Sequence, residues 1–144
     1  MAETITRTEN FGVPWESAYG YVQARQHGDT IYISGQLGHK GTELVAPAPV
    51  DADGRTTDGS NMADQMRQTY VNIGELLTRF GATFDNVVEE VLYVTDFAAA
   101  FAAAGPVRKA AYGREDPQVA STLIGITQLA LQGQLIEIKI IARV

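Results

Sequence analysis

The sequence predicts a single α+β domain in which two helices cover one face of a sheet. Three observations carry this prediction: an amphipathic helical segment at residues 60–80, an alternating strand at residues 135–144, and an expected order of strand, strand, helix, strand, helix, strand, strand. The chain has 144 residues, of which 45% are hydrophobic, so we treat residues 1–144 as one domain with its own core.

The first two strands are expected within residues 19–36, with Tyr21 on the first and Ser34 on the second, and they form a hairpin that turns at Gly28 and Asp29. The second strand, TIYISG, is rich in β-branched and aromatic residues, as half-buried strands are. Gly35 is expected to end or bulge it. Residues 38–59 then combine proline, aspartate and glycine, which predicts a long loop with one short strand, of a length that is often functional.

The clearest helix is expected at residues 60–80, started by Ser60 or Asn61 and stopped at Gly81. Its apolar side chains recur at helical spacing and predict a buried face. That face holds Met62, Met66, Thr69, Tyr70, Ile73, Leu77 and Phe80.

A strand is expected next at residues 86–96, followed by an alanine-rich helical region at 97–113. Because Gly105 and Pro106 interrupt that region, we expect two short helical pieces, with Pro106 as the first residue of the second. Another strand is expected at residues 119–126.

The last strand alternates, so its two faces are predicted directly. One face holds Ile136, Ile138, Ile140, Ala142 and Val144, and the other holds Leu135, Glu137, Lys139, Ile141 and Arg143. We expect the first face to pack on the helices. The opposite face of the sheet carries more apolar side chains than water favours, so self-association is expected to cover it.

Composition excludes several classes of function. The net charge is −6 and no basic run occurs, which argues against nucleic acid as a partner. Without cysteine there is no disulfide, thiolate metal site or cysteine nucleophile. The two histidines form no metal motif, and no glycine spacing fits a phosphate loop. With no signal-peptide pattern or membrane-spanning stretch, we expect a cytoplasmic protein that does not bind membranes.

An ordered set of segments resembles the RidA/YjgF family. The segments are GDTIYISGQL, MRQTYVNIGELL, GATFDNVVEEVLYVTD and STLIGITQLA followed by LIEIKIIA, and the match runs from about Tyr19 to Val144. The resemblance implies a chorismate-mutase-like α+β fold and a homotrimer with small-molecule clefts between subunits. It also implies hydrolysis of reactive imines and enamines, such as 2-aminoacrylate, to ammonia and a 2-keto acid without any cofactor.

Carried over residue by residue, the resemblance implies catalytic roles for Tyr21 and Glu137 and substrate-binding roles for Ser34 and Gly35. Glu137 would position the attacking water, which is chemically sensible if partial burial raises its pKa. Ser34 lacks the Gly-x-Ser-x-Gly pattern of a serine hydrolase. His39 is a further candidate acid or base at the rim of the cleft.

The family's carboxylate anchor is missing from the strand that should carry it. In active members, an arginine in a Pro-Ala-Arg-Ser motif binds the substrate carboxylate with its planar fork. Residues 119–122 align with that motif, and Ser121 stands where the arginine would be. Ser121 and Thr122 are therefore expected to line the cleft for a differently shaped or uncharged substrate. Arg108, on the nearby helical region, is an alternative source of the cation.

Three functions stay open from the sequence. The first is a RidA-like hydrolase or deaminase whose substrate is not an ordinary 2-imino acid, because a carboxylate desolvated without a partner costs several kcal/mol. The second is a non-catalytic trimer that binds a metabolite or a protein. The third is a ribonuclease or translation inhibitor, an old label in the family, against which the acidic charge argues.

Overall fold

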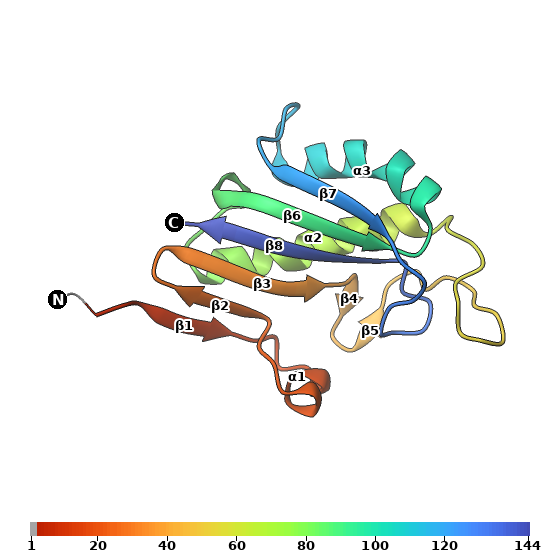
Figure 1. Cartoon of the computed structure of the whole chain (residues 1–144), viewed down its shortest axis with the longest axis horizontal. Helices are drawn as coiled ribbons and strands as arrows, with labels where there is room; N and C mark the ends of the chain where they lie inside the picture. The colour runs from red at the N-terminus through yellow and green to blue at the C-terminus, as the bar shows by residue number, and fades with distance from the viewer. Residues whose placement is uncertain (1–2) are drawn as a thin grey trace.

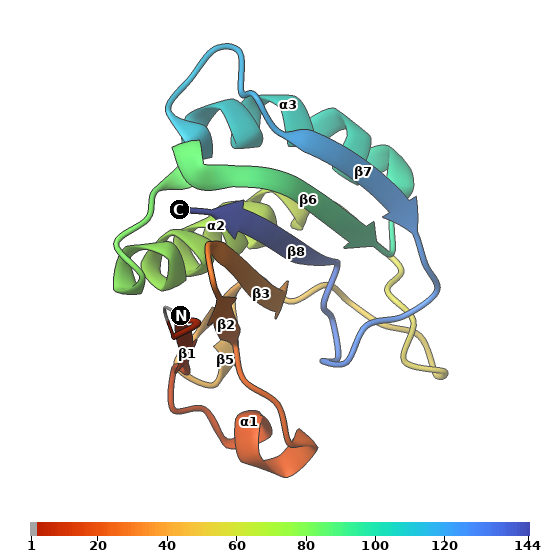
Figure 2. The same cartoon turned by 60° about the vertical axis from the view of Figure 1, so that its left-hand side comes forward.

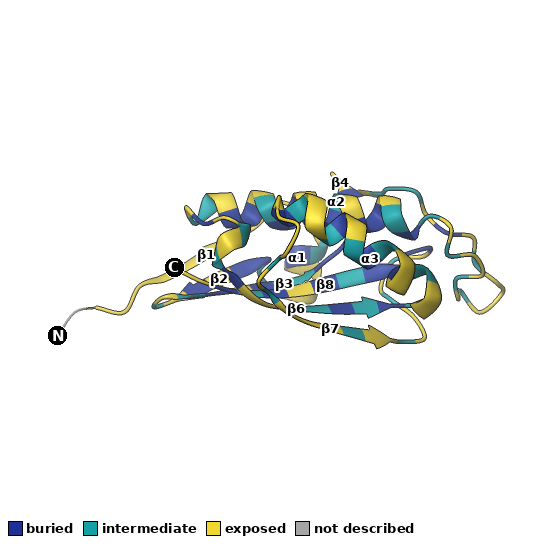
Figure 3. Ribbon diagram, turned by 90° about the horizontal axis from the view of Figure 1, so that it is seen from above, coloured by how far each residue is buried: buried dark blue, intermediate teal, exposed yellow. Residues whose placement is uncertain are grey.

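A computed structural model describes residues 3–144 and shows one mixed sheet with two long helices on one face (Figure 1). The six strands of this sheet are, in spatial order, β1 (Thr6–Glu9), β2 (Ala24–His27), β3 (Thr30–Gln36), β8 (Ile136–Arg143), β6 (Val87–Val94) and β7 (Ala120–Gly125). Helices α2 (Met62–Arg79) and α3 (Phe97–Tyr112) lie together on one side of it (Figure 3). The predicted fold class and the position of the helices are confirmed.

In the six-stranded sheet that residues 3–144 form, one pair of neighbouring strands is parallel. β6 and β7 run parallel because α3 connects them as a crossover, whereas the other neighbours pair antiparallel. β7 lies at one edge of the sheet and β1 at the other, as Figure 2 shows. The predicted hairpin of β2 and β3 is present, with His27 paired to Thr30 around a turn in which Gly28 has a φ of 61°.

The N-terminal segment holds two elements that the sequence did not predict. β1 pairs with β2, and a short helix α1 (Pro14–Tyr19) follows it. The buried carboxylate of Glu16 accepts backbone N–H groups of Phe11, Gly12 and Val13 at 2.8–3.1 Å, which fixes the approach to α1. Because the chain is helical to Tyr19, β2 begins later than expected.

Helix α3 corrects the sequence prediction. It is continuous from Phe97 to Tyr112 and passes through Pro106, so the expectation of two pieces is wrong. Proline leaves the carbonyl four residues earlier without its helical donor. That carbonyl belongs to Ala102, which is exposed, so water can hydrate it. Ala104 and Val107, on either side of the proline, are both buried against the sheet, and this packing keeps the helix whole.

The apolar faces of α2 and β8 form the core. Every predicted face residue of α2 is buried except Phe80, which is half-buried. On β8, Ile136, Ile138, Ile140 and Ala142 are all 0% exposed, whereas Val144 lies past the strand and is exposed. Leu135 was expected on the opposite face but is buried. It precedes β8, so the alternation of the strand does not apply to it, and its N–H donates to Gln65 Oε1 of α2 at 2.8 Å, which holds it on the helix side.

The loop at residues 38–59 is ordered against α2. It contains a small hairpin of β4 (His39–Lys40) and β5 (Glu43–Leu44). The buried side-chain amide of Gln65 donates to the carbonyls of Ala46 and Gly133 at 3.0 and 2.9 Å. It thereby joins this loop to the loop before β8. A short 3-10 helix, η1 (Phe84–Asn86), precedes β6.

The face of the sheet opposite the helices is only partly apolar. It carries exposed Tyr32 and Ile124 and half-buried Val91, Tyr93 and Ile141. The self-association predicted for this face stays a prediction. Among residues 3–144, no helix is long and apolar enough to cross a membrane.

Candidate functional site

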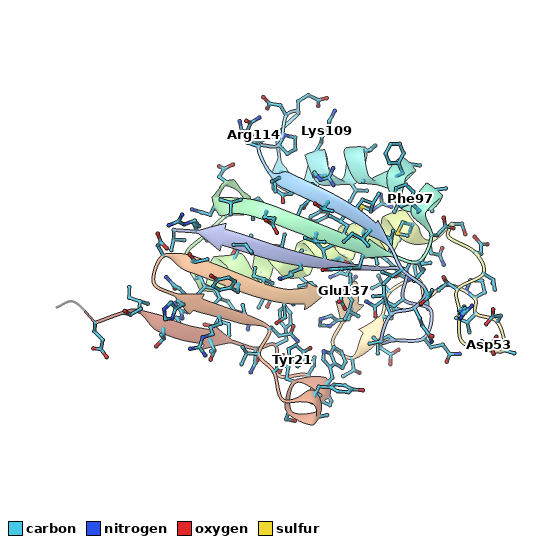
Figure 4. The ribbon with its side chains drawn as sticks, in the orientation of Figure 1. Tyr21, Asp53, Phe97, Lys109, Arg114 and Glu137 are labelled. Carbon is cyan, nitrogen blue, oxygen red and sulfur yellow. The ribbon has the colours of Figure 1, made fainter. Side chains whose placement is uncertain are left out.

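A groove with a volume of about 470 Å³ opens where β3 and β8 meet the N-terminal helix. Four of the predicted site residues line it together: Tyr21, Ser34, Gly35 and Glu137. The remaining lining residues are Trp15, Tyr19, Leu37, Ala130 and Leu131. Figure 4 shows Glu137 on the sheet and Tyr21 below it beside α1. The groove thus combines an aromatic and aliphatic wall with one carboxyl group, the phenols of Tyr19 and Tyr21, and one aliphatic hydroxyl.

Glu137 provides the carboxyl group, and Gly35 makes room for it. Glu137 lies on β8 with its side chain on the face away from the helices, against the bulge of β3 between Ile33 and Gln36. A Cβ atom on Gly35 would lie 2.5 Å from Cδ and 2.7 Å from Cγ of Glu137, which no real contact allows. Burial raises the pKa of Glu137, and a hydrogen bond from Gln134 only partly offsets this. The result is a carboxyl group that holds a proton more readily than an exposed glutamate does, as a group that exchanges protons with a substrate requires.

Tyr21 lies between α1 and β2 rather than on a strand, which corrects the position expected from the sequence. Its hydroxyl oxygen accepts a hydrogen bond from Gln23 Nε2 at 3.3 Å. Burial is the main reason why the pKa of Tyr21 is raised, and the charges of Glu16 and Glu137 add to it. The phenol therefore stays protonated and can act as a hydrogen-bond donor.

Ser34 occupies the bulge of β3 and is tied to the chain before β2. Its Oγ donates to the carbonyl of Val22 at 2.7 Å, and its N–H donates to the carbonyl of Gln23 at 2.8 Å. The hydroxyl proton is therefore already used, while the oxygen can still accept a hydrogen bond. This geometry agrees with the sequence in giving Ser34 no activated-nucleophile arrangement.

The other predicted binding residues do not line this groove. Ser121 and Thr122 lie on β7, which is separated from β8 by β6. By alternation Thr122 shares the open face of the sheet with Glu137, whereas Ser121 points to the helix side. There Ser121 Oγ accepts a hydrogen bond from Arg108 Nη2 at 2.9 Å. The serine at the motif-arginine position is thus in contact with an arginine from α3.

Arg108 is also part of a buried ionic cluster. Its Nε donates to Oε1 of Glu90, a β6 residue that is 0% exposed. Oε2 of Glu90 accepts hydrogen bonds from the hydroxyls of Tyr70 and Tyr112, both at 2.9 Å. Burial and then the charge of Glu90 raise the pKa of both phenols. We call these four residues the Glu90 cluster.

His39 lies behind the groove rather than on its rim. It is buried, and the rings of Phe11 and Trp15 pack edge-on against it at 5.4 and 5.2 Å. Its Nδ1 lies 2.8 Å from the carbonyl oxygen of Gly41, which can only accept, so Nδ1 is the donor. His39 therefore supports the aromatic wall formed by Trp15. Among residues 3–144, no group of acidic or histidine side chains is arranged to hold a metal ion.

Sequence reasoning missed the aromatic and aliphatic wall. Trp15 and Tyr19 belong to α1, whose only signals were Pro14 at its start and Gly20 after its end. Ala130 and Leu131 lie in the irregular segment before β8, where no periodicity marks a position. A search of the sequence for prolines that open short helices would have found α1 but not its place beside Glu137.

Comparison with known proteins gives a consistent family. The family model described as Endoribonuclease L-PSP matches residues 13–144. The chain is 31% identical to "Protein mmf1, mitochondrial" of Schizosaccharomyces pombe over 126 residues, covering 88% of this chain and 69% of that one. It is 29% identical to "RutC family protein YjgH" of Escherichia coli, covering 97% of both chains. Because one relative is named mitochondrial, a cytoplasmic location stays a prediction.

Two further likenesses bear on fold and activity. The crystal structure of Rv2704 of Mycobacterium tuberculosis, titled a member of the YjgF/YER057c/UK114 family, superposes with a TM-score of 0.75 at 28% identity. It covers 97% of this chain and 100% of that one. A Bos taurus protein named 2-iminobutanoate/2-iminopropanoate deaminase is 38% identical over 76 residues, which is 53% of this chain and 47% of that one.

Proposed function

The chain belongs to the RidA/YjgF family, and we propose that it is a cofactor-independent hydrolase of imines or enamines that acts in the groove around Glu137. The observation that carries the proposal is a carboxyl group with a raised pKa that faces a phenol in an aromatic groove. The Bos taurus relative, named a deaminase of 2-imino acids, supports the same reaction class.

The reaction needs a base and a confined planar substrate. Glu137, as the carboxylate, takes a proton from a water molecule while the water oxygen adds to the carbon of the C=N bond. The nitrogen takes a proton from solvent or from a donor in the groove, which gives a neutral carbinolamine. This intermediate collapses when Glu137 gives its proton to the leaving nitrogen and the hydroxyl group releases its own proton, which gives a carbonyl compound and ammonia or an amine. Trp15 and Tyr19 offer flat apolar surface on which a planar substrate can stack, and Ser34 Oγ can accept its N–H.

The substrate that best fits this groove is uncharged. None of the nine residues that line the groove is lysine or arginine, so a carboxylate there would lose hydration without gaining a cation. Arg108 could replace the family's carboxylate-binding arginine, because it contacts Ser121 at that motif position. Its charge, however, is already largely neutralised by its ion pair with Glu90. We therefore propose a neutral imine or enamine in place of a 2-imino acid.

In a homotrimer, a neighbouring subunit would complete this groove. Ser121, Thr122 and Arg108 do not line the groove of their own chain, so they can act as binding residues there only from a second copy. The exposed β7 edge and the apolar residues on the open face are available for such an assembly. Analytical ultracentrifugation tests this part, with a trimer expected and a monomer contradicting it.

The activity test uses one neutral and one anionic substrate. Diphenylmethanimine is a stable neutral imine whose hydrolysis gives benzophenone and ammonia, and 2-aminoacrylate can be generated in situ by a serine dehydratase. Wild-type protein should accelerate hydrolysis of the neutral imine, and Glu137→Gln should abolish the acceleration. No acceleration of either substrate would contradict the proposal. Faster turnover of 2-aminoacrylate would contradict only the uncharged-substrate part.

A binding trimer without chemistry is the second candidate. The absence of a cation from the groove lining, together with its aliphatic wall, also suits passive binding of a neutral metabolite. The same assay separates the two, because a binding protein would hold diphenylmethanimine or benzophenone without increasing the rate. The ribonuclease activity in the family's description has less support here, since the net charge is −6. Salt-dependent RNA binding would revive it.

A further inference from the structure

Two glutamine side chains connect Tyr21 to the backbone of the sheet. Gln23 and Gln36 are 2% and 1% exposed, and neither lines the groove. Gln36 Nε2 donates to the carbonyl of Ser34 at 2.9 Å and to Gln23 Oε1 at 2.8 Å. Gln23 Nε2 in turn donates to the hydroxyl oxygen of Tyr21 at 3.3 Å. The two amides form a continuous chain from a main-chain carbonyl to the phenol.

The direction of this chain is fixed by chemistry. A carbonyl oxygen can only accept, so the group of Gln36 that faces Ser34 has to be its NH₂. The same NH₂ faces Gln23, which has to present its oxygen. The NH₂ of Gln23 is then left on the side of Tyr21. Flipping either amide would set donor against donor or oxygen against oxygen in a buried position, which costs about 1–3 kcal/mol for each unmatched group.

The consequence concerns the proton of Tyr21. Because the phenol oxygen accepts from Gln23, its own O–H bond has to point in another direction. Within residues 3–144, the side chains that hydrogen-bond the phenol oxygen are donors, the amide of Gln23 and the indole of Trp15, so the O–H is left available to the groove that Tyr21 lines. An undirected phenol could either donate or accept, and this one is held as a donor.

We propose that the buried amides of Gln23 and Gln36 hold Tyr21 as a hydrogen-bond donor into the groove, which thereby selects ligands that present a lone pair there. A neutral imine nitrogen or a carbonyl oxygen fits this requirement, whereas an iminium or ammonium group does not. Gln23 and Gln36 are positioning residues, since both act through Tyr21.

This inference deepens the proposed function and rests on it for the chemical step. As water adds to the C=N carbon and gives its proton to Glu137, the imine nitrogen takes the proton of Tyr21 and the phenol becomes a phenolate. When Glu137 gives its proton to the nitrogen and the carbinolamine collapses, the phenolate takes the proton of the carbinolamine hydroxyl and is restored. The second hydrogen bond, from Gln23, stabilises that phenolate, because a donor to oxygen favours its anionic form.

The first test follows the phenol without any substrate. Tyr21 is replaced by 3-fluorotyrosine, whose lower pKa keeps the titration within reach, and its ¹⁹F signal is followed with pH. Gln23→Leu is expected to move the titration to higher pH, because the donor to the phenol is lost. Gln26→Leu is the matched control: this buried amide on β2 donates to the carbonyl of Gly28 at 3.0 Å and should leave the signal unchanged. An unshifted titration in Gln23→Leu would overturn the proposal.

The second test is a double-mutant cycle on diphenylmethanimine hydrolysis. Gln23→Leu should lower kcat about tenfold with little change in KM, as expected for one hydrogen bond to a charged group in the transition state. The effect should vanish when Tyr21 is already phenylalanine. An equal loss in both backgrounds would overturn the proposal. If the ¹⁹F titration shifts as expected but no variant or wild type hydrolyses imines, the positioning role stands and the proposed function alone fails.

Discussion

Two glutamates on neighbouring strands of this sheet have opposite environments. Glu90 on β6 points to the helices, is fully buried, and has both carboxylate oxygens bound by Tyr70, Tyr112 and Arg108. Glu137 on β8 points to the other face, into an open groove, and no cation lines that groove. The two strands are directly paired, so a single sheet presents both carboxyl groups on its two faces.

The difference separates a structural carboxylate from a reactive one. Glu90 has a full set of donors, so a bound ligand would have to displace an existing partner. Glu137 is desolvated without a charge partner, which raises its pKa and leaves it free to exchange protons with a ligand. The comparison therefore predicts that changes in the Glu90 cluster affect stability and that changes around Glu137 affect activity.

The largest effect is expected for Glu137→Gln. Loss of a general base costs about 10²–10⁴-fold in rate, so kcat on diphenylmethanimine should fall by that factor while the fold is unchanged. Steady-state kinetics with matched circular dichroism spectra would measure this. Glu75→Gln, at an exposed position on α2, is the control and should keep full activity. If kcat of Glu137→Gln were within threefold of the wild-type value, Glu137 would not be the reactive glutamate.

The next effect is the loss of the cation from the Glu90 cluster. Arg108→Leu leaves a fully buried carboxylate without its charge partner, which costs about 3–5 kcal/mol of unfolding free energy. Urea denaturation would measure it. Lys109→Leu, the next residue on α3, has an exposed ion pair with Glu115 and should change stability by less than about 1 kcal/mol. Equal unfolding free energies of the two variants would show that the ion pair with Arg108 does not stabilise buried Glu90.

Gln65→Leu tests a connection between α2 and the segment that carries the groove wall. The change leaves the carbonyl of Ala46 and the N–H of Leu135 without partners and removes one of the two donors to the carbonyl of Gly133, so we expect a loss of about 3 kcal/mol. Gln68→Leu, whose amide bonds only Asn72 on the same helix, is the control. Thermal unfolding should place Gln65→Leu well below the control, and coincident transitions would contradict this role.

The phenols of the two regions should also differ. Tyr70→Phe and Tyr112→Phe each remove one donor to buried Glu90 and should cost about 1–2 kcal/mol. Tyr21→Phe leaves the buried amide of Gln23 without its weak acceptor at 3.3 Å, which should cost about 1 kcal/mol, and unlike the other two it should also lower kcat. Measuring all three variants by urea denaturation would contradict the comparison if Tyr21→Phe proved the least stable.

The smallest effect is the pH dependence of stability contributed by Glu137. A carboxyl group whose pKa is raised in the folded state binds protons more tightly there than in the unfolded chain. Stability therefore falls as pH rises from the ordinary glutamate pKa through the raised value. Glu137→Gln has no carboxyl group at this position and lacks this loss. Its free energy of unfolding should therefore equal that of wild type in acid and slightly exceed it at neutral pH. A variant that is less stable than wild type at neutral pH would contradict the desolvation of Glu137.

The sequence was sufficient for the regular elements but not for the groove wall. Alternation placed Ile136, Ile138 and Ile140 correctly because a strand has one period and one buried face. The prediction for Pro106 was wrong because local preference did not include the packing of Ala104 and Val107 on the sheet. The place of α1 beside Glu137 depends on contacts between residues distant in the sequence, such as the packing of Trp15 on His39, which have no local signal.

The most direct test of the account measures activity and stability together for Glu137→Gln and Glu90→Gln. For Glu137→Gln we expect at least a 100-fold loss of kcat on diphenylmethanimine, with unfolding at the same or a higher urea concentration. In Glu90→Gln the guanidinium of Arg108 loses its buried charge partner, so we expect a loss of several kcal/mol with normal kcat in the folded protein. The reverse pattern, or equal losses of activity in both variants, would contradict the assignment of Glu137 as the reactive group.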